Sequence, residues 1–410
     1  MKTKALDYFN PWIIGVTLFV IITNVTYVAF TTPDFIRSIY RILSFGKELT
    51  IGVWWSSICL VISSMLFYKV FLSIEAWSKK YPWAILSICS ICLAIDELGT
   101  LHELVKKNYG WIGLLPFAIC FVLGYVIAIF QLLKLPNSKQ TAYLVLGAIS
   151  FFLLVVCLEY FEYHPYFDIY PQKIIRYLSE EVSELIGMNL LIIAGFVGLS
   201  KQRFNSIYLS EIFTDVLVEQ QTRIIIAFGL SINILLIYTV GFEFGSKFRG
   251  NPFLVFPCFT FFILGISCFY HSSPIDTKNF QRLVGVVLIL SSISQPMSLD
   301  HLIYALTKVK MEFLGNSIIG WMSTLLPLMF CYSLGKTKTI KTKMVFMILL
   351  PVVVICFFSY ANNDINFDYF NDDNKTVHFA YFTYSSFVAY FCFELIRRKR
   401  ITISHTNLKY

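Results

Sequence analysis

The sequence predicts an all-α, polytopic integral membrane protein with about twelve spanning helices. Composition is the first reason: hydrophobic residues make up 57% of the 410 positions and charged residues only 14%. An ordinary soluble domain carries roughly 25% charged residues, which it needs to cover its surface. The second reason is that the apolar residues gather in runs of about twenty, the length that a helix needs to cross a bilayer.

The apolar runs place the expected helices. They lie at residues 11–30, 51–73, 83–101, 111–134, 142–160, 182–200, 223–241, 252–270, 283–303, 311–335, 343–361 and 378–396. The first run follows Lys2 and Lys4 but is full length and lacks a small-x-small cleavage pattern, so we expect a permanent helix there. The natural division is into two six-helix halves, residues 1–205 and 206–410.

A matched pair of segments indicates that the two halves are tandem repeats. Leu114-Leu115-Pro116 matches Leu325-Leu326-Pro327, and a Cys, a Leu and a Gly follow each at identical spacing. Both segments fall in the fourth span of their half, and an even number of spans per half would make the repeats parallel. This layout is similar to that of the major facilitator transporters in topology alone. Residues 74–80 lack that family's Gly-Asp-Arg-Gly-Arg type signature, so no membership is assigned.

The basic residues orient the chain. With both termini in the cytoplasm, about twenty-one of the 33 lysines and arginines fall on the inner side, as the positive-inside rule requires. The clusters Lys336–Lys343 and Arg397–Arg400 contribute most, and we interpret them as membrane-surface anchors rather than nucleic-acid contacts. The expected location is the bacterial cytoplasmic (inner) membrane, with the lipid bilayer as partner and no nucleic acid.

The third predicted span ends in ionisable residues that lipid does not tolerate alone. At about 100° per residue, one arc of this helix carries Cys89, Cys92, Asp96, Gly99, Thr100 and Glu103. The opposite arc, assigned to lipid, carries Ile91, Ala94, Ile95, Leu98 and Leu101. Glu97 lies about 100° round the helix from Asp96, which assigns it to a different contact. His102 lies near the lipid-side edge, where an interfacial role competes with a functional one. A carboxylate at this depth must face partners or water.

Further acidic residues accompany later spans. Glu162 and Glu184 flank the loop between the fifth and sixth spans, and Asp300, His301 and Glu312 belong to the ninth and tenth. Glu180 and Glu181 need no function, because acidic residues in the first turn of a helix are favoured by its dipole. The candidates that topology puts in the outer leaflet are Asp96, Glu103, Glu162, Glu184, Asp300, His301 and Glu312. We therefore expect one polar site there, with helix kinks at Pro116, Pro296 and Pro327.

Three classes of function fit this expected site. No phosphate-binding loop, dinucleotide-binding turn or His-Glu-x-x-His motif is present, so no cofactor is evident. The favoured function is a transporter or channel for an ion or small solute, in which the polar site carries protons or binds a cation. The first alternative is a membrane-embedded enzyme acting on a lipid-linked substrate at the outer face. If it held a metal, the candidate ligands would be His301, Asp300, Glu103 and Glu184. The second alternative is a non-catalytic scaffold or sensor subunit. Whether the protein is an enzyme stays open, with the balance against it.

Overall fold

All the regular secondary structure in the described part of the chain is helical. The computed structural model describes residues 51–99, 109–161, 172–201, 255–270 and 278–294, together with residues 15–19, 21–22, 102 and 105. The chain divides into two compact units: Met1–Val216 with Ala305–Thr307, and Leu217–Tyr304 with Lys308–Tyr410.

Five helices of the first unit are long and apolar enough to cross a membrane. They are α3 (Ile51–Ser73), α4 (Trp77–Gly99), α6 (Leu115–Lys134) with the 3-10 turn η2 (Trp111–Leu114) before it, α7 (Lys139–Phe161) and α8 (Gln172–Ser200). The second unit contributes the shorter apolar helices α11 (Val255–Tyr270) and α12 (Lys278–Ser294). The protein is therefore a helical integral membrane protein. The predicted spans at 223–241, 311–335, 343–361 and 378–396 lie outside the described residues.

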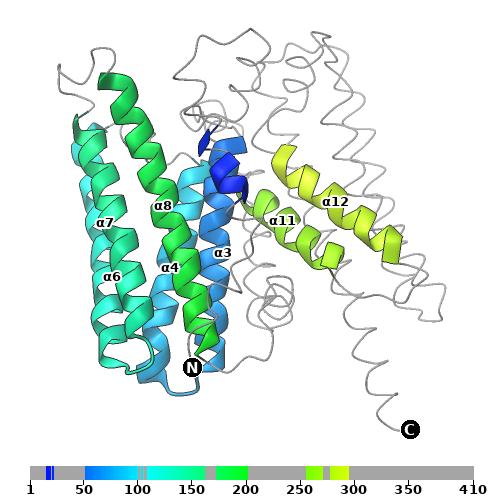
Figure 1. The fold of residues 1–410 in the computed structure, drawn as a ribbon, viewed down its shortest axis with the longest axis horizontal. Helices are drawn as coiled ribbons and strands as arrows, with labels where there is room; N and C mark the ends of the chain where they lie inside the picture. Colours follow the sequence, from blue (N-terminus) through cyan, green and yellow to red (C-terminus); the bar gives the residue numbers. More distant parts are fainter. Residues whose placement is uncertain are drawn as a thin grey trace, which may run out of the picture. The chain divides into compact units, whose positions relative to one another are not determined.

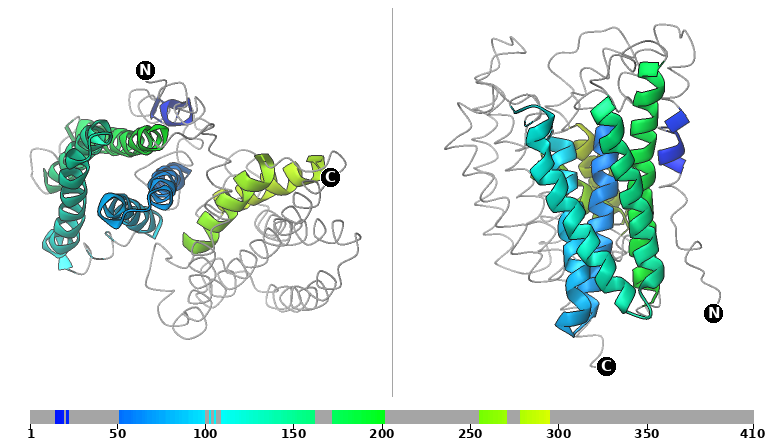
Figure 2. Two further views of the ribbon diagram at one scale, coloured as in Figure 1. Left: turned by 90° about the horizontal axis from the view of Figure 1, so that it is seen from below. Right: turned by 90° about the vertical axis from the view of Figure 1, so that its left-hand side faces the viewer.

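The five spanning helices close into a ring. Each packs against two neighbours, in the order α3, α4, α6, α7, α8 and back to α3 (Figures 1 and 2). Their burial differs strongly. Within the apolar 18-residue stretch of each helix, the buried share is 72% in α3 and 67% in α8, against 17% in α6 and 28% in α7. The large exposed side chains of α6 and α7 include Phe117, Phe130 and Leu153. In a bilayer, α6 and α7 therefore offer the main lipid-facing surface of this unit.

Small residues let α8 approach its neighbours closely. A Cβ added to Gly195 would lie 2.6 Å from the Cβ of Leu66 on α3, and one on Gly198 would lie 2.6 Å from the ring of Trp83 on α4. Helices in lipid associate through such close packing, because lipid tails provide no hydrophobic force between them. The backbone of α8 thus lies directly against α3 and α4.

Polar side chains add hydrogen bonds between the helices. Ser64 of α3 and Ser87 of α4 each donate to the other's backbone carbonyl, at 2.9 and 3.0 Å. Thr17, in the first predicted span, accepts from Trp55 Nε1 at 3.1 Å and from Asn189 Nδ2 at 3.5 Å. Since Trp55 lies on α3 and Asn189 on α8, Thr17 is hydrogen-bonded to two neighbouring helices of the ring.

The starts of α4 and α8 differ most from the predicted ones. Helix α4 begins at Trp77 and runs through Pro82, six residues before the expected start. Helix α8 begins at Gln172, ten residues early, because polar residues extend it beyond its apolar run. Pro116 lies in the first turn of α6, beside η2, where a proline removes no helical hydrogen bond.

The buried face of α4 also differs from the predicted one. Cys89 and Gly99 are buried as expected, but so are Ala94 and Leu98, which the sequence assigned to lipid. This assignment was wrong because α4 packs against both α3 and α6, so its enclosed surface is wider than one polar arc.

Candidate polar site

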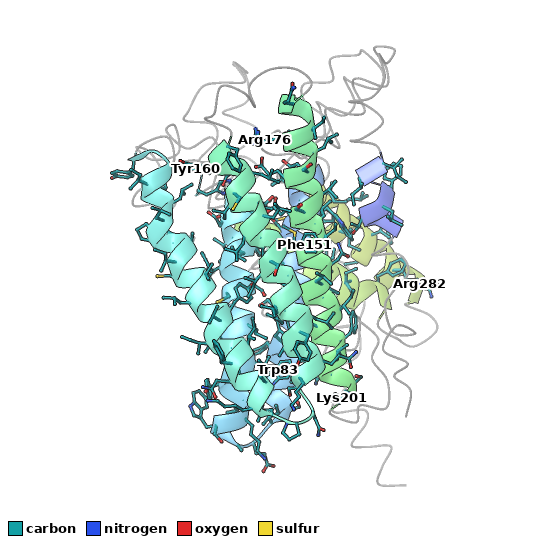
Figure 3. The ribbon with its side chains drawn as sticks, turned by 60° about the vertical axis from the view of Figure 1, so that its left-hand side comes forward. Trp83, Phe151, Tyr160, Arg176, Lys201 and Arg282 are labelled. Atoms are coloured by element: carbon teal, nitrogen blue, oxygen red, sulfur yellow. The ribbon has the colours of Figure 1, made fainter. Side chains whose placement is uncertain are left out.

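The site lies at one end of the first unit, where α4 and α7 end and α8 begins. We call this the acidic end and the opposite end the lysine end; Figure 3 shows Tyr160 and Arg176 at the first and Trp83 and Lys201 at the second. Helix α8 has 29 residues against 23 in α4 and in α7. Because its extra turns precede the apolar part, Glu184 lies well inside α8 and still reaches the last turn of α4.

Asp96 and His102 form a pair through two contacts. Asp96 Oδ1 accepts the backbone N–H of His102 at 2.8 Å, and Oδ2 lies 3.2 Å from His102 Nδ1. Both side chains are about one-third exposed, at 30% and 32%. His102 follows the end of α4 at Gly99 and lies against Asp96, a pairing that an unbroken helix would not give.

The surroundings of His102 favour its charged form. Burial by itself lowers the pKa of the imidazole, but the hydrogen bond to Asp96 and the negative charges of Asp96, Glu97 and Glu159 outweigh it and raise the pKa to about 10. At neutral pH, His102 is therefore an imidazolium facing carboxylates from α4 and α7.

Glu97 of α4 and Glu184 of α8 approach each other closely enough for their carboxyl groups to interact directly. Glu184 also interacts electrostatically with Asp96, His102 and Glu159. Asp96 and Glu184 are thus in electrostatic range of each other, and Glu97 belongs to the same group.

Two carboxylates that sequence reasoning did not select complete the group. Glu159, in the last turn of α7, interacts with Glu184 and His102, and Glu181 interacts with Glu184 and Glu97. The dipole interpretation of Glu181 was wrong, because α8 begins at Gln172 and Glu181 lies beyond its first turn. The i, i+3 spacing of Glu181 and Glu184 was the available signal. We call Asp96, Glu97, Glu159, Glu181 and Glu184 the carboxylate cluster.

Arg176 holds the helices that carry the cluster. Its buried guanidinium lies 2.7 Å from Glu180 Oε2 and donates to the carbonyl of Leu158 at 3.3 Å. Leu158 belongs to the last turn of α7, where carbonyls lack a partner within the helix. Arg176 thus ties the start of α8 to the end of α7, and Glu180 is engaged in an ion pair rather than in a dipole interaction.

The remaining sequence candidates fall elsewhere. Glu103, Glu162, Asp300, His301, Glu312, Pro296 and Pro327 lie outside the described residues. Within the described residues, no group of three or more His, Cys, Asp and Glu side chains has an arrangement that could hold a metal ion.

Fold and site together define a helical membrane protein whose spanning bundle holds an ionisable cluster at one end. Residues 13–199 match a family described as a domain of unknown function, DUF8692, and this range includes the whole carboxylate cluster. No curated protein matches the chain, and no solved structure matches it.

Proposed function

We propose that the protein is a multi-pass transporter or channel for an ion or a small solute, and that the carboxylate cluster binds the proton or cation involved. The proximity of Glu97 and Glu184, which interact electrostatically, carries this proposal. It brings together two carboxyl groups from helices that are distant in sequence, with Asp96, Glu159 and Glu181 in electrostatic range.

Electrostatics gives the reason. An ionised carboxylate within a spanning helix costs a few kcal/mol, and carboxylates in close contact cannot all stay ionised without a counter-charge. His102 supplies one positive charge to the cluster, and Arg176 is engaged with Glu180. The balance requires protons or a bound cation. Reversible gain and loss of that charge is what couples transport to an ion gradient.

The finer architecture belongs to the same proposal: about twelve spans, arranged as two parallel six-helix repeats. Two helix pairs support it, α3–α4 and α11–α12, which would be the second and third spans of their halves. Ser64 and Ser87 exchange side-chain-to-carbonyl hydrogen bonds in the first pair. Cys258 and Ser292 do the same in the second, at 3.3 and 2.9 Å.

In both pairs a basic side chain also lies over an aromatic ring of the partner helix. Lys80 of α4 lies 4.9 Å from the ring centroid of Phe71 on α3. Arg282 of α12 lies 6.0 Å from that of Phe269 on α11. Each pair thus combines a basic residue over an aromatic ring near the turn with a reciprocal hydrogen bond deeper in the helices. The residue spacings differ between the two pairs, so the likeness is one of pattern rather than of register, and as such it supports the proposed repeat.

Flux measurements on the purified protein in liposomes test the function. Wild-type protein should dissipate an imposed proton or monovalent-cation gradient, read by a pH-sensitive or cation-sensitive dye. Asp96→Asn, Glu97→Gln and Glu184→Gln keep the side-chain shape and remove the charge, so each should lower the flux by about tenfold or more, the effect of roughly 1.4 kcal/mol.

Glu75→Gln is the matched control. Glu75 is exposed in the linker between α3 and α4, at the lysine end, so its neutralisation should leave the flux unchanged. Flux in the three cluster variants equal to that of wild type, at equal incorporation, would refute the proposal. No wild-type flux under any gradient would favour the scaffold or sensor alternative, for which the internal pairs Asp96–His102 and Arg176–Glu180 would serve only to hold helices together.

A further inference from the structure

Lysines from three separate parts of the sequence gather at the lysine end of the first unit. Lys79 and Lys80 lie in the first turn of α4, Lys134 and Lys139 bracket the turn between α6 and α7, and Lys201 follows α8. Successive helices along the chain run antiparallel, whereas α8 and α3 run parallel where they close the ring, so these positions all fall at one end (Figures 1 and 3). Among the described residues at the lysine end, Glu75 carries a negative charge.

An aromatic group accompanies these lysines at the corner between α3 and α4. Trp77, 66% exposed, contacts Phe71 edge-on at 6.3 Å between ring centroids. Phe71 in turn stacks on Tyr68 at 5.7 Å. The ammonium of Lys80 lies 4.9 Å from the centroid of Phe71 and 5.3 Å from that of Trp77. These cation–π contacts hold the ammonium in place, and its N–H donors can still bind an acceptor.

The lengths of the helices place these lysines and aromatic rings at the level of the lipid head groups. Helices α3, α4 and α7 have 23 residues each, and at about 1.5 Å per residue they are slightly longer than a hydrocarbon core of roughly 30 Å. Their ends therefore reach the interface, where tryptophan and tyrosine rings are favoured and where the lipid phosphates lie.

We propose that the lysine end of the first unit is a binding surface for anionic phospholipids. Lys79, Lys80, Lys134, Lys139 and Lys201 supply the charge for the head groups, and Tyr68, Phe71 and Trp77 lie beside the upper acyl chains. Charge complementarity identifies the partner, because a basic surface at this depth meets the phosphates of lipids in the plane of the membrane. The surface is separate from the carboxylate cluster and does not depend on the proposed transport.

Photo-crosslinking of the full-length protein in nanodiscs tests this surface. The probe is phosphatidylglycerol with a photoactivatable head group, in a phosphatidylcholine bilayer, and crosslinked peptides are mapped by mass spectrometry. Peptides that cover 68–80, 134–139 and 201 should dominate over those that cover 96–110 and 159–180. The Lys79→Gln/Lys80→Gln variant should lower crosslinking of the first of these peptides by about fivefold for each charge removed.

Matched variants and competitors distinguish binding of the lipid from unspecific reaction with the probe. Glu75→Gln removes a negative charge at the same corner and should raise the yield. The exposed pair Lys139→Gln/Lys201→Gln serves as a second variant if the first does not fold, and should lower the yield at 134–139 and 201. Unlabelled phosphatidylglycerol should compete and inorganic phosphate should not. Equal labelling of both ends, yields unaffected by either lysine pair, or competition by inorganic phosphate would each overturn the proposal.

Discussion

Asp96 shows how one carboxylate can be stabilised near the end of a spanning helix. It accepts the backbone N–H of His102 and also lies against the ring nitrogen of that residue, and the resulting imidazolium partly balances Glu97 and Glu159. The same pair also makes the site sensitive to pH, since a histidine with a raised pKa binds its proton more tightly in the folded protein than in the unfolded one.

The direction of this pH dependence follows from the shift. The pKa of His102 rises from the ordinary value of 6.5 to about 10 on folding. Its contribution to stability is therefore full below pH 6.5 and is lost as the pH rises through about 10. Asp96→Asn removes the main partner, so the variant should melt at a lower temperature than wild type at neutral pH, and the gap should narrow as the pH rises.

Melting temperatures of both proteins in detergent, measured across that pH window, check the prediction. The comparison with Asp96→Asn cancels the titration of lysines and tyrosines that the two proteins share. A gap that stays constant with pH would show that the Asp96–His102 pair is not the titrating element.

At the scale of elements, α8 is the helix on which the first unit is assembled. It packs against α3 and α7, contacts Trp83 of α4 through Gly198, and carries Glu184 of the carboxylate cluster. Glycines on its inner face remove the side chains that would hold the neighbours away. Packing around Trp83 and Gly198 is tight, because Val70 also borders the glycine and Phe67 lies within 6.2 Å of the Trp83 ring.

Gly198→Ala should therefore destabilise the protein by about 1–3 kcal/mol, the usual cost of overpacking. The new methyl group would lie 2.6 Å from two ring atoms of Trp83, and the enclosed ring has no room to move away. The measurement is thermal or denaturant unfolding in detergent, followed by helix content.

Gly147→Ala in α7 is the matched control. Its Cβ would meet only Leu190 Cδ1, at 3.5 Å, which is an ordinary contact. Since alanine is favoured over glycine in a helix by up to about 1 kcal/mol, this variant should be as stable as wild type or slightly more so. Equal stability of the two variants would contradict the close packing of α8 on Trp83.

At the scale of the whole molecule, most of the acidic and basic residues described here lie at opposite ends of the first unit. The acidic end carries the carboxylate cluster and the lysine end carries the basic surface, with the apolar parts of α3, α4, α6, α7 and α8 between them. Such a separation orients a membrane protein with its lysines in the cytoplasm. The carboxylate cluster would then face the outside, with the start of α8 on the same side.

Cysteine accessibility in a Cys-free background measures this orientation. Glu75 and Tyr109 are exposed at the lysine end and the acidic end, respectively. Tyr109→Cys should react with a membrane-impermeant maleimide in intact cells, and Glu75→Cys only after the membrane is permeabilised. The reverse pattern would invert the orientation and place the cluster on the cytoplasmic side.

By itself, the sequence determined the membrane class and the approximate position of the described spans, because the length of an apolar run is a local property. The expected runs at 51–73 and 111–134 coincide with α3 and with η2 plus α6. The sequence also singled out Asp96 and Glu184, because a carboxylate inside an apolar run is visible without any structure.

Tertiary structure alone decided which ionisable groups meet. His102 reaches Asp96 because α4 ends at Gly99, and Glu159 and Glu181 join the cluster because α7 and α8 pack side by side. The extra turns of α8 and the buried side of α4 were likewise beyond sequence reasoning. Each depends on contacts between residues far apart in the chain, whereas helical periodicity relates only near neighbours.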